Sequence, residues 1–315
     1  MSNRLAVLLL LAGTFAIGFS PTFVRLSEIG PVATAVHRVA LALPLLFLVL
    51  AVEPRRGATT PSRALPETVA DFRDLVLAGL FFAGDLAFWH WSITETSVAN
   101  ATLFATSTPI FVTIAAWLWL GERITRRFMA GLALSLAGAA MLAGSSYQSA
   151  PGHLYGDFLG VVTALFFSGY LLMVKRLRAR FSAAAIMAWS GVVTAITLAG
   201  LNLWAGEQWL PLSLSGWAIL IGLALLSHAA GQGLVAQALA RLPASFSAVG
   251  MLSEPIFAAI IAWIVLHEAV TPLQAAGGVV ILAGIVLARP RNSANAGAAP
   301  TNGASVSPPD EKAGG

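Results

Sequence analysis

The sequence predicts an all-α polytopic membrane protein with ten transmembrane helices, arranged as two inverted five-helix repeats around a central cavity. Three observations support this fold class. Hydrophobic residues make up 57% of the chain and charged residues only 10%, whereas soluble domains usually carry about 25% charged residues. The apolar residues gather in long runs without charge. One apolar segment near residue 110 also recurs near residue 255.

Loop signals divide the chain into ten apolar runs of the length needed to span a bilayer, which is about 20 residues. The first run continues beyond the core of a signal peptide and lacks a small-residue cleavage site, so we expect a membrane span there. In chain order the expected spans are 5–24, 32–52, 74–93, 98–120, 127–145, 156–174, 183–204, 215–239, 245–266 and 271–289.

The basic residues test this division, because Lys and Arg concentrate on the cytoplasmic side of a membrane protein. With both termini in the cytoplasm, every Lys and Arg except Arg25 and Arg38 falls in a cytoplasmic segment. This pattern predicts a multi-pass protein of the plasma membrane with both termini in the cytoplasm. The basic loops lack the interleaved aromatic residues of a nucleic-acid surface, so we expect no nucleic-acid partner.

An internal repeat relates the two halves of the chain. The segment STPIFVTIAAWLWLGE begins at Ser107, and SEPIFAAIIAWIVLHE begins at Ser253, which is an offset of 146 residues. The expected units are a first repeat at 1–145, a second repeat at 155–289 and a disordered cytoplasmic tail at 290–315. Because each repeat holds an odd number of spans, the second must enter the membrane from the opposite side. Inverted repeats of this kind are typical of secondary transporters, with the substrate site between the halves.

The Pro-x-Phe starts of these two segments, their glutamate ends and the glycine-bearing spans that follow resemble the drug/metabolite transporter superfamily, EamA-type branch. The segment GDLAFWHWSITETSVANATLFATSTPIF is similar to the subgroup of YddG-like amino-acid exporters. The resemblance covers residues 5–289. It implies a basket of spans 1–4 and 6–9 around a central cavity, with spans 5 and 10 peripheral. It also implies the export of small metabolites, with amino acids, including aromatic ones, as expected substrates.

Polar residues inside apolar spans are costly and usually face a cavity or a partner. Span three is the richest in them, and its helical periodicity places Asp85 and Trp89 on one stripe and His90 on the adjacent one. The offset of 146 places His228 and Gln232 of span eight on the equivalent arc. Each of these residues has packing or helix–helix hydrogen bonding as the alternative role. Further candidates for the substrate pathway, on spans four and six, are Asn100, Ser107 and Tyr170.

The repeated segments also suggest gating elements. Pro109 and Pro255 each remove a backbone donor and should bend their helices beside the cavity. Glu254 precedes only the second proline, so symmetry does not require it; it is a candidate gate or proton site, with a helix cap as the alternative. We assign Glu122 and its repeat counterpart Glu268 to structural roles at span ends. We expect His37 and Arg38 at the outer start of span two, as an outer gate or paired with Glu28.

Two alternative functions were weighed against a metabolite exporter. A drug/proton antiporter of the small multidrug type would need a carboxylate in the first span, and Leu5–Val24 has none. An intramembrane enzyme would need a nucleophile elbow, a His-Glu-x-x-His zinc site or an acidic metal cluster, and none occurs. We therefore expect no enzymatic activity, no cofactor and no metal. The expected partners are a small-molecule substrate, the lipid bilayer and, as a candidate coupling ion, protons.

Overall fold

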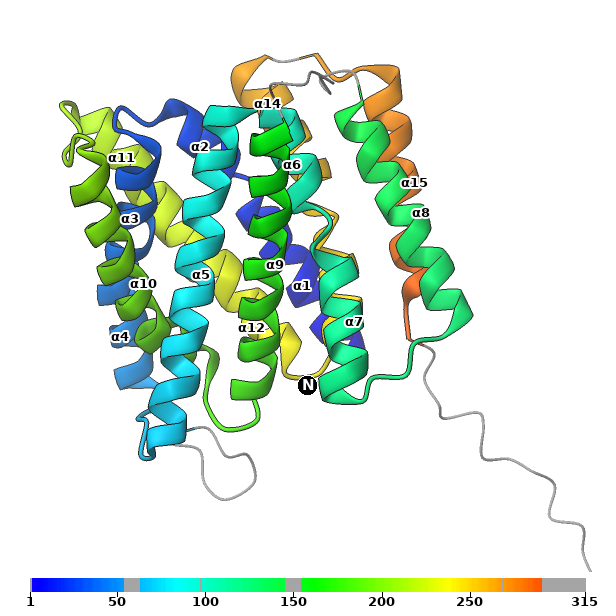
Figure 1. The fold of residues 1–315 in the computed structure, drawn as a ribbon, viewed down its shortest axis with the longest axis horizontal. Helices are drawn as coiled ribbons and strands as arrows, with labels where there is room; N and C mark the ends of the chain where they lie inside the picture. Colours follow the sequence, from blue (N-terminus) through cyan, green and yellow to red (C-terminus); the bar gives the residue numbers. More distant parts are fainter. Residues whose placement is uncertain (1, 54–62, 97, 145–153, 268, 291–315) are drawn as a thin grey trace, which may run out of the picture.

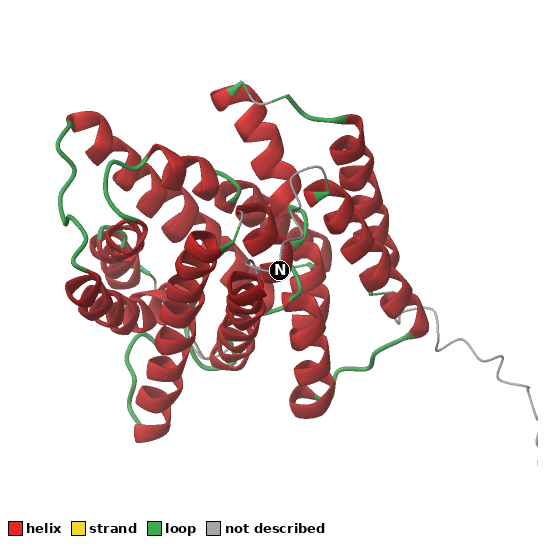
Figure 2. Ribbon diagram, turned by 45° about the horizontal axis from the view of Figure 1, so that its top comes forward, coloured by secondary structure: helices red, strands yellow, loops and turns green. Residues whose placement is uncertain are grey.

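A computed structural model describes residues 2–53, 63–96, 98–144, 154–267 and 269–290. The described part is built from helices joined by short links, apart from one isolated bridge between Arg63 and Phe181 (Figures 1 and 2). In chain order the helices are α1 (Asn3–Ile17), α2 (Ser20–Leu26), α3 (Pro31–Ala40), α4 (Leu43–Val52), α5 (Val69–Glu95), α6 (Val98–Ala105), α7 (Thr108–Leu120), α8 (Arg126–Ala143), α9 (Leu154–Leu177), α10 (Ala183–Ala205), α11 (Leu214–Gly222), the π-helix η2 (Leu223–Gln232), α12 (Gly233–Leu239), α13 (Ala244–Met251), α14 (Glu254–Leu266) and α15 (Pro272–Ala288).

Within the described residues, nine helical segments are long and apolar enough to cross a membrane, and they coincide with the first nine predicted spans. The tenth predicted span coincides with α15, an apolar helix of 17 residues, just short of the 18 required of the others. The fold class is therefore that of a multi-pass helical membrane protein, and the count of ten spans stays a prediction. Of the predicted tail, the structure describes only Pro290; residues 291–315 lie outside the described residues.

Five of the spans are composites of shorter helices, namely α1–α2, α3–α4, α6–α7, α11–η2–α12 and α13–α14. In four of these a proline lies in the first turn after the break, where its missing N–H would otherwise lack a partner. Hydroxyls bind the carbonyls freed at two breaks. Ser107 Oγ donates to the Phe104 carbonyl at 2.6 Å, and Ser253 Oγ donates to the Gly250 carbonyl at 2.8 Å. These two pairs are equivalent under the 146-residue repeat.

Two repeat-related helices, α8 and α15, pack against each other through glycines at one edge of the bundle (Figure 1). A Cβ added at Gly131 would lie 2.6 Å from the Gly284 carbonyl, and one at Gly138 would lie 2.7 Å from the Gly277 carbonyl. Gly131 and Gly277 are equivalent in the repeat, as are Gly138 and Gly284. The helices therefore run antiparallel and present the same glycine pair to each other, which an in-plane two-fold relation between the repeats requires.

An ion-pair network closes the end of the bundle that carries the N-terminus, here called the basic end. Asp71 and Asp74, in the first turns of α5, have side chains that are 1% and 2% exposed. Arg180, in the link between α9 and α10, binds Asp71 at 2.5 Å and Asp74 at 2.6 Å. Charges buried this deeply need such partners. The network thus ties α5 to the α9–α10 link, and it also includes Arg63, Arg73 and Arg176.

The opposite end is held by carboxylates that bind backbone N–H groups. Glu28 accepts hydrogen bonds from the backbone N–H groups of Leu212 and Ser213, at 3.0 and 3.1 Å, and from the Ser213 hydroxyl. Glu207 accepts one from the Ala33 N–H at 2.9 Å. These bonds join the α2–α3 link to the α10–α11 link. The predicted pairing of Glu28 with Arg38 is wrong, because Glu28 is engaged by the start of α11 and Arg38 lies inside the bundle.

Candidate functional site

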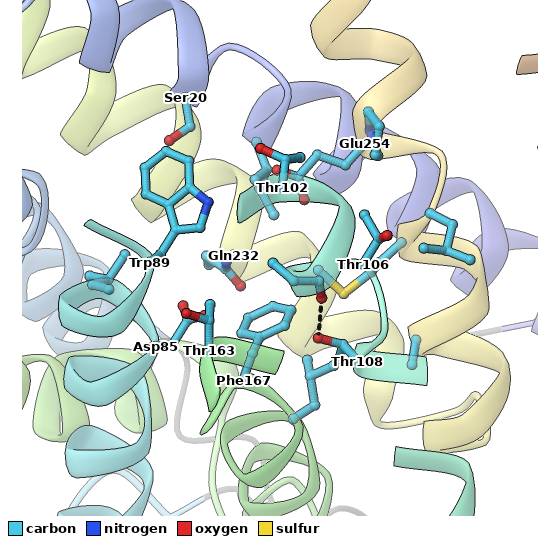
Figure 3. Close-up of a pocket in the computed structure, with 18 of the residues that line it drawn as sticks. Ser20, Asp85, Trp89, Thr102, Thr106, Thr108, Thr163, Phe167, Gln232 and Glu254 are labelled. Carbon is cyan, nitrogen blue, oxygen red and sulfur yellow. Dashed lines mark hydrogen bonds between the residues drawn. The ribbon is translucent and has the colours of Figure 1, made fainter. Parts of the chain in front are cut away.

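A cavity of about 170 Å³ lies inside the helix bundle, at the level where the spans are broken (Figure 3). Three breaks supply part of its wall: the α1–α2 break, the α6–α7 break and the α13–α14 break. The remaining wall comes from α3, α5, α9 and the last residue of η2. The helix breaks matter chemically because they interrupt the backbone hydrogen bonding beside the cavity and place short polar side chains in its wall. Such a site can bind a polar solute within an apolar bundle.

Three charged residues line the cavity. Arg38 comes from α3, Asp85 from α5 and Glu254 from the first turn of α14. Asp85 and Glu254 are drawn on opposite sides of the view in Figure 3. The lining thus contains one positive and two negative groups. The cavity can therefore bind a solute that carries both a positive and a negative charge.

The Arg38 side chain is incompletely bound by the protein. The residue is 7% exposed, and its Nη1 donates to Ser20 Oγ at 3.0 Å. Its buried Nε has no hydrogen-bond partner, and among the described residues no carboxylate lies within 4.0 Å of the guanidinium. A buried charged donor without an acceptor is costly. The guanidinium is therefore available to a carboxylate or similar anion that enters the cavity, a group it can bind through two parallel hydrogen bonds.

The two carboxylates are also available. In the part of the chain that the structure describes, neither Asp85 nor Glu254 makes a side-chain hydrogen bond or ion pair within the protein. Both are half-buried and both line the cavity. An ammonium group is the natural partner for a pair of carboxylates in a site of low polarity.

Aromatic rings form one wall of the cavity and pack behind it. Trp89 and Phe167 line the cavity directly. Phe167 stacks on Tyr170 with ring centroids 6.0 Å apart, and Tyr170 packs on Phe82 at 4.6 Å. Phe82 in turn stacks on His228 at 5.4 Å. A continuous aromatic layer thus supports one side of the cavity and offers flat apolar surface to a solute.

Hydroxyl and amide groups complete the polar lining. Thr102, Thr106, Thr108 and Thr163 face the cavity from α6, the α6–α7 break, α7 and α9 (Figure 3). The Thr108 hydroxyl donates to the Ala105 carbonyl at 2.8 Å, a carbonyl that Pro109 leaves without its helical partner. Gln232, at the end of the π-helix, lines the cavity with its buried Oε1 unpartnered. Single π-turns often mark functional positions in helices.

The residues proposed from sequence fall into four groups. Asp85, Trp89, Gln232, Glu254 and the two prolines Pro109 and Pro255 line the cavity. His90, Tyr170 and His228 are buried behind it; His90 Nδ1 lies 2.5 Å from the Leu86 carbonyl. Ser107 binds the Phe104 carbonyl beside the cavity. The side chain of Asn100 and all of Glu268 lie outside the described residues.

Arg38 is the residue that sequence reasoning misplaced. We expected it at an outer gate, whereas it lines the cavity from the last turn of α3. Its neighbour His37 does lie toward the Glu28 end, with its ring edge-on to Trp217 at 5.8 Å. The available signal was its position in an otherwise uncharged span, because a charge inside a span usually faces the bundle interior.

Comparison with known proteins adds the family. Residues 4–144 and 154–289 each match the model of the EamA-like transporter family. The chain belongs to this family. It is therefore a multi-pass membrane transporter of the drug/metabolite superfamily and not an enzyme. The first matched stretch contains α8 and the second contains α15, the two helices that pack through glycines.

Several EamA relatives are similar over most of the chain. The pseudopaline exporter CntI of Pseudomonas aeruginosa is 28% identical over 217 residues, which is 68% of this chain and 74% of that protein. A protein described as a probable terminal-alkyne amino-acid exporter of Streptantibioticus cattleyicolor is 28% identical over 225 residues, covering 68% of this chain and 73% of the relative. One solved crystal structure shares the fold, with a TM-score of 0.78 at 17% identity, and covers 91% of this chain and 98% of that one.

Proposed function

We propose that this EamA transporter exports an amino acid, or a small zwitterion derived from one, out of the cytoplasm by alternating access between repeats 1–145 and 155–289. The observation that carries the proposal is the cavity with one incompletely bound guanidinium and two unpartnered carboxylates. An α-amino acid presents one carboxylate and one ammonium group and so complements this set of charges. A cationic drug would leave Arg38 without an acceptor.

Each group of the proposed solute has a candidate partner among the residues that line the cavity. Arg38 binds the carboxylate, since its buried Nε lacks an acceptor. One of the two carboxylates, Asp85 or Glu254, binds the ammonium group, and Trp89 and Phe167 contact the side chain. The volume of about 170 Å³ is smaller than the roughly 300 Å³ at which drug-sized pockets begin. Size therefore favours a metabolite over a bulky drug.

The names of the relatives support the same class of solute. CntI is named as an exporter of pseudopaline, and the Streptantibioticus relative as an exporter of a terminal-alkyne amino acid. A drug/proton antiporter could use the two carboxylates, but a cationic drug would leave the Arg38 guanidinium without an acceptor. Among the groups that could carry a coupling proton, Asp85 and Glu254 are the ones that line the cavity. The distribution of basic residues supports cytoplasmic termini in a bacterial inner membrane, with the bilayer as the resident partner.

Gating is proposed for the broken spans. Pro109 and Pro255 both line the cavity at breaks that the repeat relates, and Glu254 lies directly before the second. Movement at these breaks would change the cavity wall without separating the long packed helices. Replacing both prolines with alanine should slow exchange while solute binding persists. Unchanged exchange in the double variant would contradict this role.

Counterflow in proteoliposomes tests the substrate class. Vesicles loaded with unlabelled solute are presented with labelled phenylalanine, leucine, lysine, a nucleoside or a cationic dye, with and without a pH gradient. We expect accumulation of at least one neutral amino acid. Two analogues of that amino acid should fail to compete with it for transport. One is the amine that lacks the carboxylate, and the other is the amide formed from the carboxylate. Movement of the dye and of no amino acid would contradict the proposal.

A further inference from the structure

A second hollow lies at the basic end, away from the central cavity, and has a volume of about 390 Å³. Three arginines from three distant parts of the chain line it. Arg4 comes from the first turn of α1, Arg241 from the link between α12 and α13, and Arg289 from the residue after α15. Along the sequence each of them marks a cytoplasmic segment, with a role at lipid headgroups as the alternative. The fold gathers them around one space.

These three arginines lack the carboxylate partners of the four arginines that surround the start of α5. Arg63, Arg73, Arg176 and Arg180 all bind the buried carboxylates of Asp71 and Asp74. Among the described residues, by contrast, no side-chain hydrogen bond or ion pair involves Arg4, Arg241 or Arg289. The hollow therefore has a concentrated positive charge that the described protein does not neutralise.

The backbone that carries two of these arginines is held in place. The α12–α13 link is bound by Lys175, whose Nζ donates to the Leu239 carbonyl at 2.9 Å and to the Leu242 carbonyl at 2.7 Å. The first turn of α1 is capped by Ser2, whose Oγ accepts from the Leu5 N–H at 3.2 Å. The arginines thus extend from ordered backbone, which lowers the entropic cost of binding an anion between them.

Apolar surface adjoins the charge. Val7 and Leu242 line the hollow itself. On the flanking helices, Leu8 is 63% exposed and Val286 is 66% exposed. Side chains of this kind on the outside of a membrane bundle face the acyl chains. The hollow therefore lies where the polar end of a helix bundle meets its apolar girdle, and both halves of an amphipathic molecule would find a matching surface.

We propose that the hollow between Arg4, Arg241 and Arg289 binds the headgroup of an anionic phospholipid. Basic pockets between transmembrane helices on the cytoplasmic side are suited to such headgroups, whose phosphate the three guanidinium groups surround. The apolar side chains beside the hollow favour a lipid over free phosphate. A bound lipid would join α1, the α12–α13 link and the end of α15, which belong to both predicted repeats.

Lipid retention by the purified full-length protein tests the site. The protein is equilibrated with equal amounts of phosphatidylglycerol and phosphatidylcholine in mixed micelles, and bound lipid is counted by native mass spectrometry. We expect preferential retention of phosphatidylglycerol. Arg4→Gln, Arg241→Gln and Arg289→Gln should each lower the retention about fivefold, the effect of one arginine near an anionic surface. Retention should also fall at high salt, since the site is exposed to solvent.

A matched control removes the same charge elsewhere at the basic end. Arg123, Arg126 and Arg127 are exposed around the start of α8 and do not line the hollow. The single variants Arg123→Gln, Arg126→Gln and Arg127→Gln should each retain phosphatidylglycerol as the wild type does. Equal loss in this control would show general attraction to positive charge and overturn the site. Retention at the wild-type level by all three single variants of the hollow would also overturn the site.

Two further experiments test whether inorganic phosphate or an acidic segment of the chain, and not a lipid, occupies the hollow. Millimolar inorganic phosphate should not displace phosphatidylglycerol; displacement at that concentration would make the hollow a phosphate site instead. Asp310 and Glu311, in the part of the chain outside the described residues, could supply a competing acidic segment. The full-length Asp310→Asn/Glu311→Gln variant should retain the same amount of lipid. A severalfold rise would show that the chain's own C-terminal segment occupies the hollow, and would overturn the proposal.

Discussion

Phe82 and His228 stack with their ring centroids 5.4 Å apart and their planes inclined by 26°. Along the chain they are separated by the repeat offset of 146 residues. Two positions related by a two-fold axis can touch only if both lie close to that axis. Ser135 and Ile281 show the same relation, because the Ser135 hydroxyl donates to the Ile281 carbonyl at 3.4 Å across an identical separation. The two contacts therefore mark where the pseudo-two-fold axis passes.

The cavity is asymmetric about this axis, because equivalent positions of the two repeats carry different residues. Phe82 lines the cavity, whereas its counterpart His228 lies behind it. Likewise Glu254 and Thr108, which are equivalent in the repeat, both line the cavity but give it a carboxylate on one side and a hydroxyl on the other. Backbone symmetry supplies a site between the halves, and differences at equivalent positions supply the charges.

Substitution of Arg38 should impair transport of carboxylate-bearing solutes. Arg38→Gln removes the charge but keeps a donor, and we expect the apparent affinity for the transported amino acid to fall about 10- to 100-fold, the range of a hydrogen bond to a charged group. Arg38→Lys should recover part of it, because an ammonium group restores the charge without the planar fork. Counterflow at several solute concentrations measures the effect. Arg127→Gln, on the surface, serves as the control, and an equal loss in both variants would contradict the role of Arg38.

Close glycine packing between α8 and α15 should make Gly138 sensitive to a single methyl group. The added Cβ of Gly138→Ala would lie 2.6 Å from the Ile281 backbone nitrogen, so the helices must separate. We expect a loss of about 1–3 kcal/mol in the free energy of unfolding, as for other overpacked sites, measured by thermal melting in detergent. Gly278→Ala, on the same α15 helix, is the matched control, because its Cβ would meet only ordinary contacts at 3.7 Å or more. Equal melting temperatures for the two variants would exclude this packing effect.

Glu122 should stabilise the start of α13 from a distant helix end. Its carboxylate accepts from the Ala244 N–H at 2.6 Å and from the Ser245 N–H and hydroxyl at 3.1 and 2.5 Å. Its structural role is thus that of a cap on the start of another helix. Glu122→Gln should cost about 1 kcal/mol, typical of a lost cap. A double-mutant cycle with Ser245→Ala, followed by thermal melting, should show coupling between the two changes; strict additivity would disprove it.

The Glu28 contact should weaken at acid pH. The Ser213 hydroxyl, together with the backbone N–H groups of Ser213 and Leu212, lowers the pKa of Glu28 below its ordinary value of 4.5. Because the carboxylate is bound only when ionised, its stabilising contribution is complete above pH 4.5 and is lost as the pH falls through the lowered pKa. Melting temperatures of the wild type and Glu28→Gln should therefore differ at pH 6 and converge at the lowest pH. A difference for Glu28→Gln that stays constant over this pH range would contradict the prediction.

Much of the architecture was predictable because apolar runs and basic loops are properties of contiguous sequence. The first nine predicted spans agree with the helices to within a few residues, and the repeat offset found from two short segments also relates contacts across the bundle. The breaks at Pro109 and Pro255 were expected from the missing backbone donor. Trp89, Asp85 and Gln232 were chosen because a polar or amphipathic group inside an apolar span needs a partner, and all three line the cavity.

The sequence by itself determined the number and positions of the apolar segments, the repeat and the membrane environment, since each depends on local composition or on similarity along the chain. Only the tertiary structure decided that Arg38 faces the cavity while Tyr170 and His228 lie behind Phe82. It also decided that Arg4, Arg241 and Arg289 share one hollow. Which face a side chain presents depends on how separate helices are rotated and paired. Those contacts join residues that are distant from one another in the chain, and no local pattern encodes them.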